Sequence, residues 1–87
     1  MKKIIFAEES WDEYLYWQLQ DIKIARKINK LIKSIERDGC LVGEGKPEKL
    51  KYQPGNYSRR IDEKNRLVYS VDDEHIIVKS CLGHYED

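Results

Sequence analysis

The sequence contains little cysteine: Cys40 and Cys81 are the two examples in 87 residues. Small secreted domains that depend on disulfides carry several closely spaced cysteines, and structural zinc sites usually need pairs of the C-x-x-C type. Neither pattern is present. We therefore expect both thiols to stay reduced and the protein to need no metal or other cofactor.

Long apolar runs are also missing. Residues 1–7 resemble the start of a signal peptide, but Glu8 and Glu9 interrupt the segment before an apolar stretch of sufficient length is complete. No stretch approaches the roughly 20 apolar residues of a transmembrane helix. These absences predict a cytoplasmic protein with no membrane partner.

The formal net charge is zero, which at first argues against nucleic-acid binding, because phosphate contacts normally need an excess of lysine and arginine. The distribution of the charges changes this interpretation. Residues 22–66 hold 13 basic and 6 acidic residues, a balance of +7, and the rest of the chain has a balance of −7. One basic face could therefore meet RNA, although the charges could also simply solvate a small surface.

Length and periodicity predict one domain, residues 1–87, of the α+β class. Residues 4–7 are typical of a short buried strand, and Ser10 to Glu13 have the S-x-x-E form of a helix capping box. A second helix follows, with Asp21 as its cap, and the short connection predicts an antiparallel helical hairpin. The apolar stripe of this second helix consists of Ile24, Ala25, Ile28, Leu31, Ile32 and Ile35.

After Asp38 and Gly39 the periodicity changes from helix to strand. Residues 57–62, 66–71 and 76–81 alternate as three successive strands. Together with the N-terminal strand they predict one twisted, mainly antiparallel sheet with both helices packed on one face.

The hairpin between the first two of these strands can be given a register. Leu67 lies on the apolar face of its strand, and Ile61 is the apolar residue across the turn with matching parity. Pairing them predicts a three-residue turn at 63–65 and leaves Arg60 and Arg66 together on the face that the helices do not cover. Two guanidinium groups on one bare face are best tolerated where an anion, such as a phosphate, is the third partner.

Cleavage of RNA without a metal needs a general base, a cation and a general acid. The sequence offers Glu48 in a loop, Arg66 on the bare face and His84 near the end of the chain. RNA supplies its own nucleophile, so the protein needs only proton transfer, alignment and charge stabilisation. Taken singly, these residues could equally be an exposed carboxylate, a surface ion-pair partner and a residue in a frayed terminus.

Six segments resemble the YoeB toxins, also called Txe, of the RelE superfamily. They are EESWDEYLYWQ at 8–18, KIN at 27–29, GKPE at 45–48, SRRI at 58–61, RLVY at 66–69 and HY at 84–85. The resemblance implies a type II toxin that enters the ribosomal A site and cleaves the exposed codon, leaving a 2′,3′-cyclic phosphate and a 5′-hydroxyl. It also implies three partners: messenger RNA on the 30S subunit with its 16S ribosomal RNA, a YefM/Axe-like antitoxin, and a second copy in a homodimer.

The same resemblance assigns roles to individual residues. Glu48 would be the general base, His84 the general acid and Arg66 the main stabiliser of transition-state charge. RNA and phosphate contacts are assigned to Lys46, Lys49, Lys51, Arg60 and Tyr85. The chain departs from the family in the loop at 38–43, at Leu82, where relatives often carry a basic residue, and in the extension Glu86-Asp87, an acidic tail that would raise the pKa of His84.

Several alternatives remain open from the sequence. A gyrase-poisoning, ParE-like toxin would not need the Glu48, Arg66 and His84 set, and a non-catalytic RNA-binding module could share the fold. The aromatic residues Trp11, Tyr14, Tyr16 and Trp17 could stack on bases, but their helical spacing favours packing in the core or at a dimer seam. The helix face with Lys23, Lys27 and Lys30 is either simply solvated or in contact with ribosomal RNA.

Overall fold

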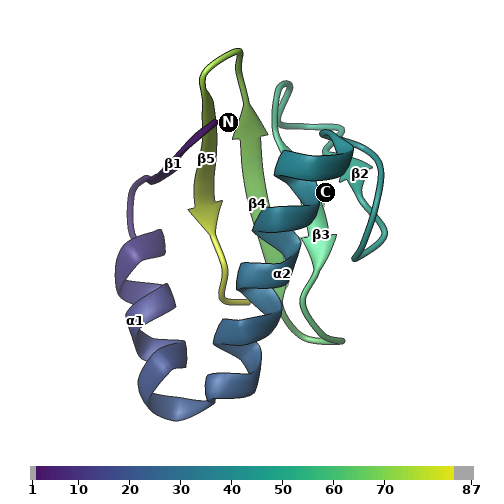
Figure 1. Ribbon diagram of the computed structural model, residues 1–87. Coiled ribbons are helices and arrows are strands. Elements are labelled where there is room, and N and C mark those ends of the chain that lie inside the picture. The colour runs from purple at the N-terminus through teal and green to yellow at the C-terminus, as the bar shows by residue number, and fades with distance from the viewer. Residues whose placement is uncertain (1, 84–87) are drawn as a thin grey trace.

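The computed structural model describes residues 2–83. Its elements are β1 (Lys3–Phe6), α1 (Ser10–Gln20), α2 (Ile22–Asp38), β2 (Glu48–Lys49), β3 (Tyr57–Arg60), β4 (Arg66–Val71) and β5 (His75–Ser80). The sheet is five-stranded in the order β1-β5-β4-β3-β2, and both helices lie on one of its faces (Figure 1). β1 is parallel to β5 and the other neighbours are antiparallel. The predicted α+β class and the helix layer on one face are confirmed.

Helix α2 supplies the helical side of the core. Its expected stripe is buried at Ala25, Ile28, Leu31, Ile32 and Ile35. The stripe packs against Leu67, Tyr69, Ile76 and Val78 of the sheet, and each such side chain contributes roughly 1.5–3 kcal/mol when it leaves water. Asp21 caps the helix as expected, since its carboxylate accepts a hydrogen bond from the N–H of Lys23 at 3.1 Å. Neither helix in the described part of the chain is long and apolar enough to cross a membrane.

Helix α1 begins at Ser10 as expected, but the predicted capping box is wrong. Its N-cap is Glu9, which makes no side-chain capping bond. The Ser10 hydroxyl is buried and bonds to the carbonyl oxygens of Ala7 and Val78, at 2.6 and 2.9 Å. The carboxylate of Glu13 accepts instead from the N–H of Cys81. The residues of the capping box thus join the helix to β5 and the segment after it, an interaction that local sequence does not reveal.

Strand β1 was predicted to be buried, and this prediction is wrong. It lies at the edge of the sheet beside β5, and Ile4 and Ile5 are 46 % and 41 % exposed. An apolar run alone does not distinguish an edge strand from a central one. Phe6 contacts the rings of Trp11 and Tyr14, with centroids 5.4 and 5.1 Å apart, so aromatic residues of α1 are used for packing.

The register of the β3–β4 hairpin differs from the prediction by two residues. Arg60 pairs with Arg66 and Arg59 with Leu67, whereas Ile61 was expected opposite Leu67. Ile61 lies in the connection at 61–65, where its N–H bonds to the carbonyl of Asn65. The physical reason is that Arg59, a charged residue, occupies the core position opposite Leu67. A shift of two residues preserves parity, so the predicted faces are still correct.

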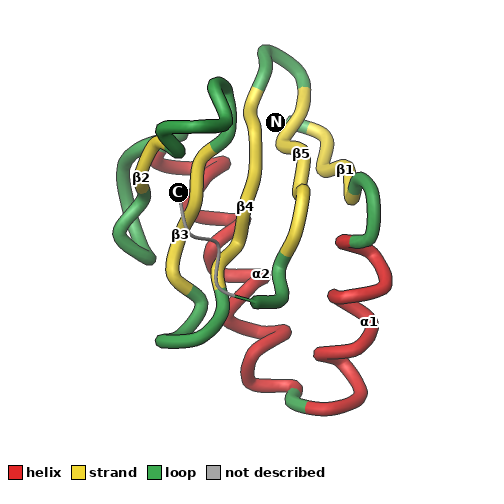
Figure 2. Tube along the Cα trace, turned by 180° about the vertical axis from the view of Figure 1, so that it is seen from behind, coloured by secondary structure: helices red, strands yellow, loops and turns green. Residues whose placement is uncertain are grey.

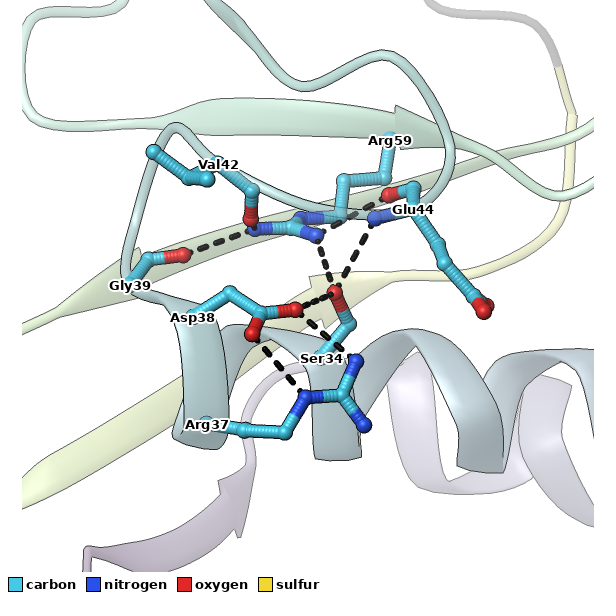
Figure 3. Close-up of polar contacts among 7 residues, drawn as sticks. All are labelled: Ser34, Arg37, Asp38, Gly39, Val42, Glu44 and Arg59. Carbon is cyan, nitrogen blue, oxygen red and sulfur yellow. Dashed lines mark hydrogen bonds and ion pairs between the residues drawn. The ribbon is translucent and has the colours of Figure 1, made fainter.

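Arg59 is the most unusual residue of the core, because it is 0 % exposed. Its Nε donates to the hydroxyl of Tyr69 at 2.9 Å, and its Nη1 donates to the hydroxyl of Ser34 at 2.9 Å. The remaining bonds go to carbonyls of the loop after α2: Glu44 at 2.9 Å, Gly39 at 2.7 Å and Val42 at 2.8 Å (Figure 3). All five N–H donors of the guanidinium are therefore satisfied.

The loop that Arg59 holds approaches the end of α2 very closely at Gly43. This glycine has φ +109°, and a Cβ there would overlap the Ser34 hydroxyl and lie 2.7 Å from Oδ2 of Asp38. A second bond fixes the loop, since the hydroxyl of Tyr69 donates to the carbonyl of Cys40 at 2.6 Å. The loop at 38–43, which distinguishes this chain from the family pattern, is thus held firmly against the core.

We expect Arg59→Lys to lower the free energy of unfolding by about 3 kcal/mol, because an ammonium cannot replace five bonds in this geometry and carbonyls of the loop lose their donors. Urea denaturation followed by circular dichroism measures the loss. Arg26→Lys, an exposed arginine of α2, is the matched control. A loss below about 0.5 kcal/mol for Arg59→Lys, the range of ordinary surface substitutions, would contradict the structural role.

Stability should also depend on pH through Asp38. Hydrogen bonds from Arg37 and then from Ser34 hold the pKa of Asp38 below its ordinary value. A carboxyl whose pKa is lower in the folded than in the unfolded state stabilises the fold above its unfolded pKa, roughly 3.9, and this contribution is lost as the pH falls further. Asp38→Asn should therefore lose less stability than the wild type between pH 7 and pH 3 in urea titrations. Equal losses would contradict the prediction.

Candidate active site

The face of the sheet away from the helices carries three of the predicted site residues: Glu48, Arg60 and Arg66. Figure 2 shows this face in front of α2. Directly opposed residues on neighbouring strands place their side chains on the same face. Arg59 and Leu67 form such a pair in the core, so the adjacent pairs must point the other way. We call the opposite surface the open face; its strand residues include Glu48, Ser58, Arg60, Arg66, Val68 and Ser80.

A single row of residues crosses four strands of the open face. Glu48 pairs with Ser58, Ser58 with Val68, and Val68 with Ser80. Glu48 is exposed in β2, at the edge of the sheet. Arg66 lies two strands away from Glu48 and two residues along β4 from the row. The Cα atoms of Glu48 and Arg66 are therefore about 12 Å apart. Both side chains can therefore reach a group that lies between them on the open face.

Arg60 and Arg66 are directly opposite each other in the ladder. Arg60 is exposed and Arg66 is half-buried. Like charges in a cross-strand pair repel each other, and a bound anion relieves this cost. The parity argument from the sequence correctly placed the two guanidinium groups on one face, although it used the wrong partner residues.

The turn before β4 fixes the position of Arg66. Its Nη1 donates to the carbonyl of Asp62 at 2.8 Å and, at longer distance, to that of Asn65 at 3.3 Å. The carboxylate of Asp62 accepts from the N–H groups of Lys64 and Asn65 at 2.8 and 2.7 Å. Partial burial raises the pKa of Asp62, but these hydrogen bonds outweigh it and the net shift is downward. Asp62 thus stays ionised and organises the turn.

The end of the described chain is held beside Arg66. The N–H of Gly83 donates to Oδ1 of Asn65 at 2.8 Å, and the N–H of Arg66 donates to the carbonyl of Gly83 at 3.0 Å. His84 follows Gly83 directly in the sequence. His84 and Tyr85, two of the predicted site residues, lie outside the described residues, as does the extension Glu86-Asp87.

A second set of contacts holds Cys81 against α1. Oε1 of Glu13 accepts from its N–H, and the indole of Trp17 donates to its carbonyl, each at 2.8 Å. Burial raises the pKa of the Cys81 thiol to about 12, so the thiol stays protonated and unreactive at neutral pH. We call Glu13, Trp17 and Asn65 the C-terminal clamp. Sequence analysis missed this clamp, because the partners are far apart in the chain and Glu13 and Trp17 had local explanations.

The three lysines predicted to contact RNA do not all lie on the same side of the sheet. Lys49 pairs with Tyr57, on the face opposite to that of Glu48. On that side, burial raises the pKa of the Cys40 thiol, and the charge of Lys49 offsets only a small part of this rise. The ladder therefore does not bring Lys49 to the open face. Lys46 and Lys51 are exposed on either side of β2. Lys46 has φ 51°, a left-handed conformation that is unusual for a residue other than glycine.

The open face thus combines a carboxylate and two guanidinium groups, with Gly83 held beside one of them. A carboxylate can accept a proton from a hydroxyl, and guanidinium groups stabilise negative charge on a phosphate. Residues 2–83 contain no group of three His, Cys, Asp or Glu side chains suited to a metal ion. The arrangement suits chemistry on a phosphodiester.

Comparison with known proteins gives the family. Residues 6–85 match the model of the YoeB-like toxin of bacterial type II toxin-antitoxin system. The YoeB toxin of Escherichia coli K12 is 51 % identical over 84 residues, covering 95 % of this chain and 99 % of the relative. A solved YoeB dimer from Staphylococcus aureus is 52 % identical with TM-score 0.93, covering 97 % of this chain and 98 % of that one.

A second solved structure, the heterotetrameric YoeB-YefM toxin-antitoxin complex from Staphylococcus aureus, is 51 % identical with TM-score 0.90 and covers 98 % of this chain and 99 % of that one. Sequence, fold and coverage agree along nearly the whole length. This chain is therefore a member of the YoeB toxin family of bacterial type II toxin-antitoxin systems.

Proposed function

We propose that this toxin is a ribosome-dependent endoribonuclease that cuts messenger RNA in the A site and so stops translation. The observation that carries the proposal is the open face, where the register puts Glu48, Arg60 and Arg66 together and where Gly83, the residue before His84, is bonded to Arg66. A substrate on the ribosome implies that the protein acts in the cytoplasm.

The proposed reaction proceeds by general acid–base catalysis without a metal. Glu48 removes the proton of the ribose 2′-hydroxyl, and the resulting oxygen attacks the adjacent phosphorus. Arg66, with Arg60 beside it, stabilises the negative charge that develops on the phosphoryl oxygens. His84 gives a proton to the departing 5′-oxygen. The products are a 2′,3′-cyclic phosphate and a 5′-hydroxyl.

The rest of the proposed RNA contacts are electrostatic. Lys46 and Lys51 are exposed near Glu48 in the chain and suit phosphate oxygens. Lys49 points away from the open face, so we propose that it contacts RNA outside the cleavage site. The role of Tyr85, to orient the substrate or stack on a base, remains a prediction from the family resemblance.

We also propose two protein partners. The related Staphylococcus aureus proteins were solved as a YoeB dimer and as a YoeB-YefM complex. By analogy, this chain forms a homodimer and is neutralised by a YefM/Axe-like antitoxin. Its single 1–87 domain would then meet ribosome, antitoxin and second copy with different parts of one small surface.

The decisive test mixes purified protein with programmed ribosomes and maps cleavage by primer extension. Glu48→Gln, Arg66→Ala and His84→Gln should each lower the cleavage rate by about 10²-fold or more, because each removes a group that acts in the transition state. Ribosome binding should persist in all three, since basic residues elsewhere are unchanged.

Glu44→Gln is the matched control for Glu48→Gln. Glu44 is also exposed in the loop, and its contacts to Ser34 and Arg59 are made by backbone atoms. Inhibition of gyrase, with the messenger RNA left uncut, would contradict the nuclease proposal. Loss of ribosome binding in all three variants would mean that these residues are structural.

The C-terminal clamp gives a separate prediction. Trp17→Phe keeps an aromatic ring but loses the bond to the Cys81 carbonyl, so the segment that leads to His84 is held less well. We expect about a tenfold lower cleavage rate, comparable to one lost hydrogen bond in an aligned site, with unchanged ribosome binding.

Trp11→Phe, a half-exposed tryptophan of the same helix, should cleave like the wild type. Cleavage and pull-down on the same ribosome preparation measure both effects. A Trp17→Phe protein with the full cleavage rate would show that the clamp does not position the site.

A further inference from the structure

The open face contains a cavity whose lining includes none of the predicted site residues. Its volume is about 390 Å³, and it is lined by Glu8, Gln53, Asn56, Val68, Lys79 and Ser80. These residues come from four elements: the turn between β1 and α1, the loop between β2 and β3, strand β4 and strand β5. The volume lies near the lower end of the roughly 300–1,000 Å³ usual for small-molecule sites, as suits a small planar group.

The cavity is adjacent to the proposed cleavage site. Val68 and Ser80 belong to the same row of paired residues as Glu48. Two strand spacings separate Glu48 from Val68, or about 10 Å between Cα atoms. A nucleotide bridges such a distance from its phosphate to the far edge of its base. A strand of RNA whose phosphodiester lies between Glu48 and Arg66 can therefore place a neighbouring base in the cavity.

The lining has the mixed character that base recognition needs. Val68 is the apolar residue of the lining, although it is itself 3 % exposed. The amide of Asn56 donates to that of Gln53 at 2.9 Å, which orients both groups. Glu8 and Lys79 add opposite charges. A site for phosphate alone would be disfavoured by the carboxylate, whereas a base presents donors and acceptors on one edge.

Two residues with unusual backbone conformations lie at the cavity and close to Glu48 in the chain. Glu8 has φ 57° and Lys46 has φ 51°, and these are the positive-φ residues other than glycine within the described 2–83 segment. Such conformations cost free energy and often occur at functional sites. One of them lines the cavity, and the other is two residues before Glu48.

We propose that this cavity receives one of the two bases that flank the scissile phosphodiester and favours guanine there. The inference rests on the proposed nuclease function and adds its sequence preference. Guanine presents two adjacent N–H groups, at N1 and N2, which a carboxylate such as that of Glu8 accepts together. Its O6 accepts from an ammonium such as that of Lys79. Adenine offers neither the paired N–H groups nor the carbonyl.

The test uses programmed ribosomes and messages that differ at one base on either side of the cleaved bond, with rates measured by primer extension. The wild type should cut fastest with guanine at one of the two positions. Glu8→Gln and Lys79→Gln should each reduce the ratio of guanine to adenine rates about tenfold, in line with loss of a base-specific polar contact.

Glu9→Gln, an exposed neighbour of Glu8 outside the cavity, makes the same change of charge and should keep the wild-type ratio. Circular dichroism confirms that each variant is folded. Unchanged preference in Glu8→Gln and Lys79→Gln, or equal shifts in Glu8→Gln and Glu9→Gln, overturns the cavity assignment and leaves the nuclease proposal standing. A wild-type protein that leaves every message intact overturns both.

Discussion

The buried guanidinium of Arg59 connects three parts of the molecule that must keep fixed relative positions: β4 through Tyr69, the end of α2 through Ser34, and the loop at 39–44 through its carbonyls. An unpaired buried charge is very costly, but here every donor is bonded. The loop next leads to Gly45, whose carbonyl accepts from the N–H of Arg60 at 2.6 Å. Glu48 follows three residues later, so the edge of the open face depends on a contact in the core.

The alternation of a strand gives the adjacent arginines opposite roles. Arg59 points into the core, and Arg60 therefore points to the open face opposite Arg66. A slip of one residue would expose Arg59 and bury Arg60, and the bonds to the loop would then be lost. The interactions of Arg59 thus specify both the register of the hairpin and the position of the two outward-facing guanidinium groups.

Local periodicity was sufficient to predict much of the fold. The stripe of α2, the cap at Asp21 and the parity of Arg60 and Arg66 all follow from neighbouring residues, and the structure confirms them. The predictions that failed had long-range causes. The hairpin register was wrong because an arginine, not Ile61, fills the core position. The capping box was wrong because its hydroxyl and carboxylate bond to β5 and Cys81. The C-terminal clamp could not be predicted from the sequence for the same reason, because its partners are far apart in the chain.

The groups that support the site are buried, and the groups proposed to act in it are exposed or half-buried. Arg59, Ser10 and Tyr69 are inaccessible, whereas Glu48, Arg60 and Glu8 are exposed. Exposed side chains contribute little to the free energy of unfolding, so their chemistry can change without loss of the fold. Substitution of a buried support residue, in contrast, affects stability and site geometry together. On the proposal above, exposed residues of the cavity such as Glu8 set the preference for an RNA base. That preference can therefore change between related proteins while the buried core stays the same.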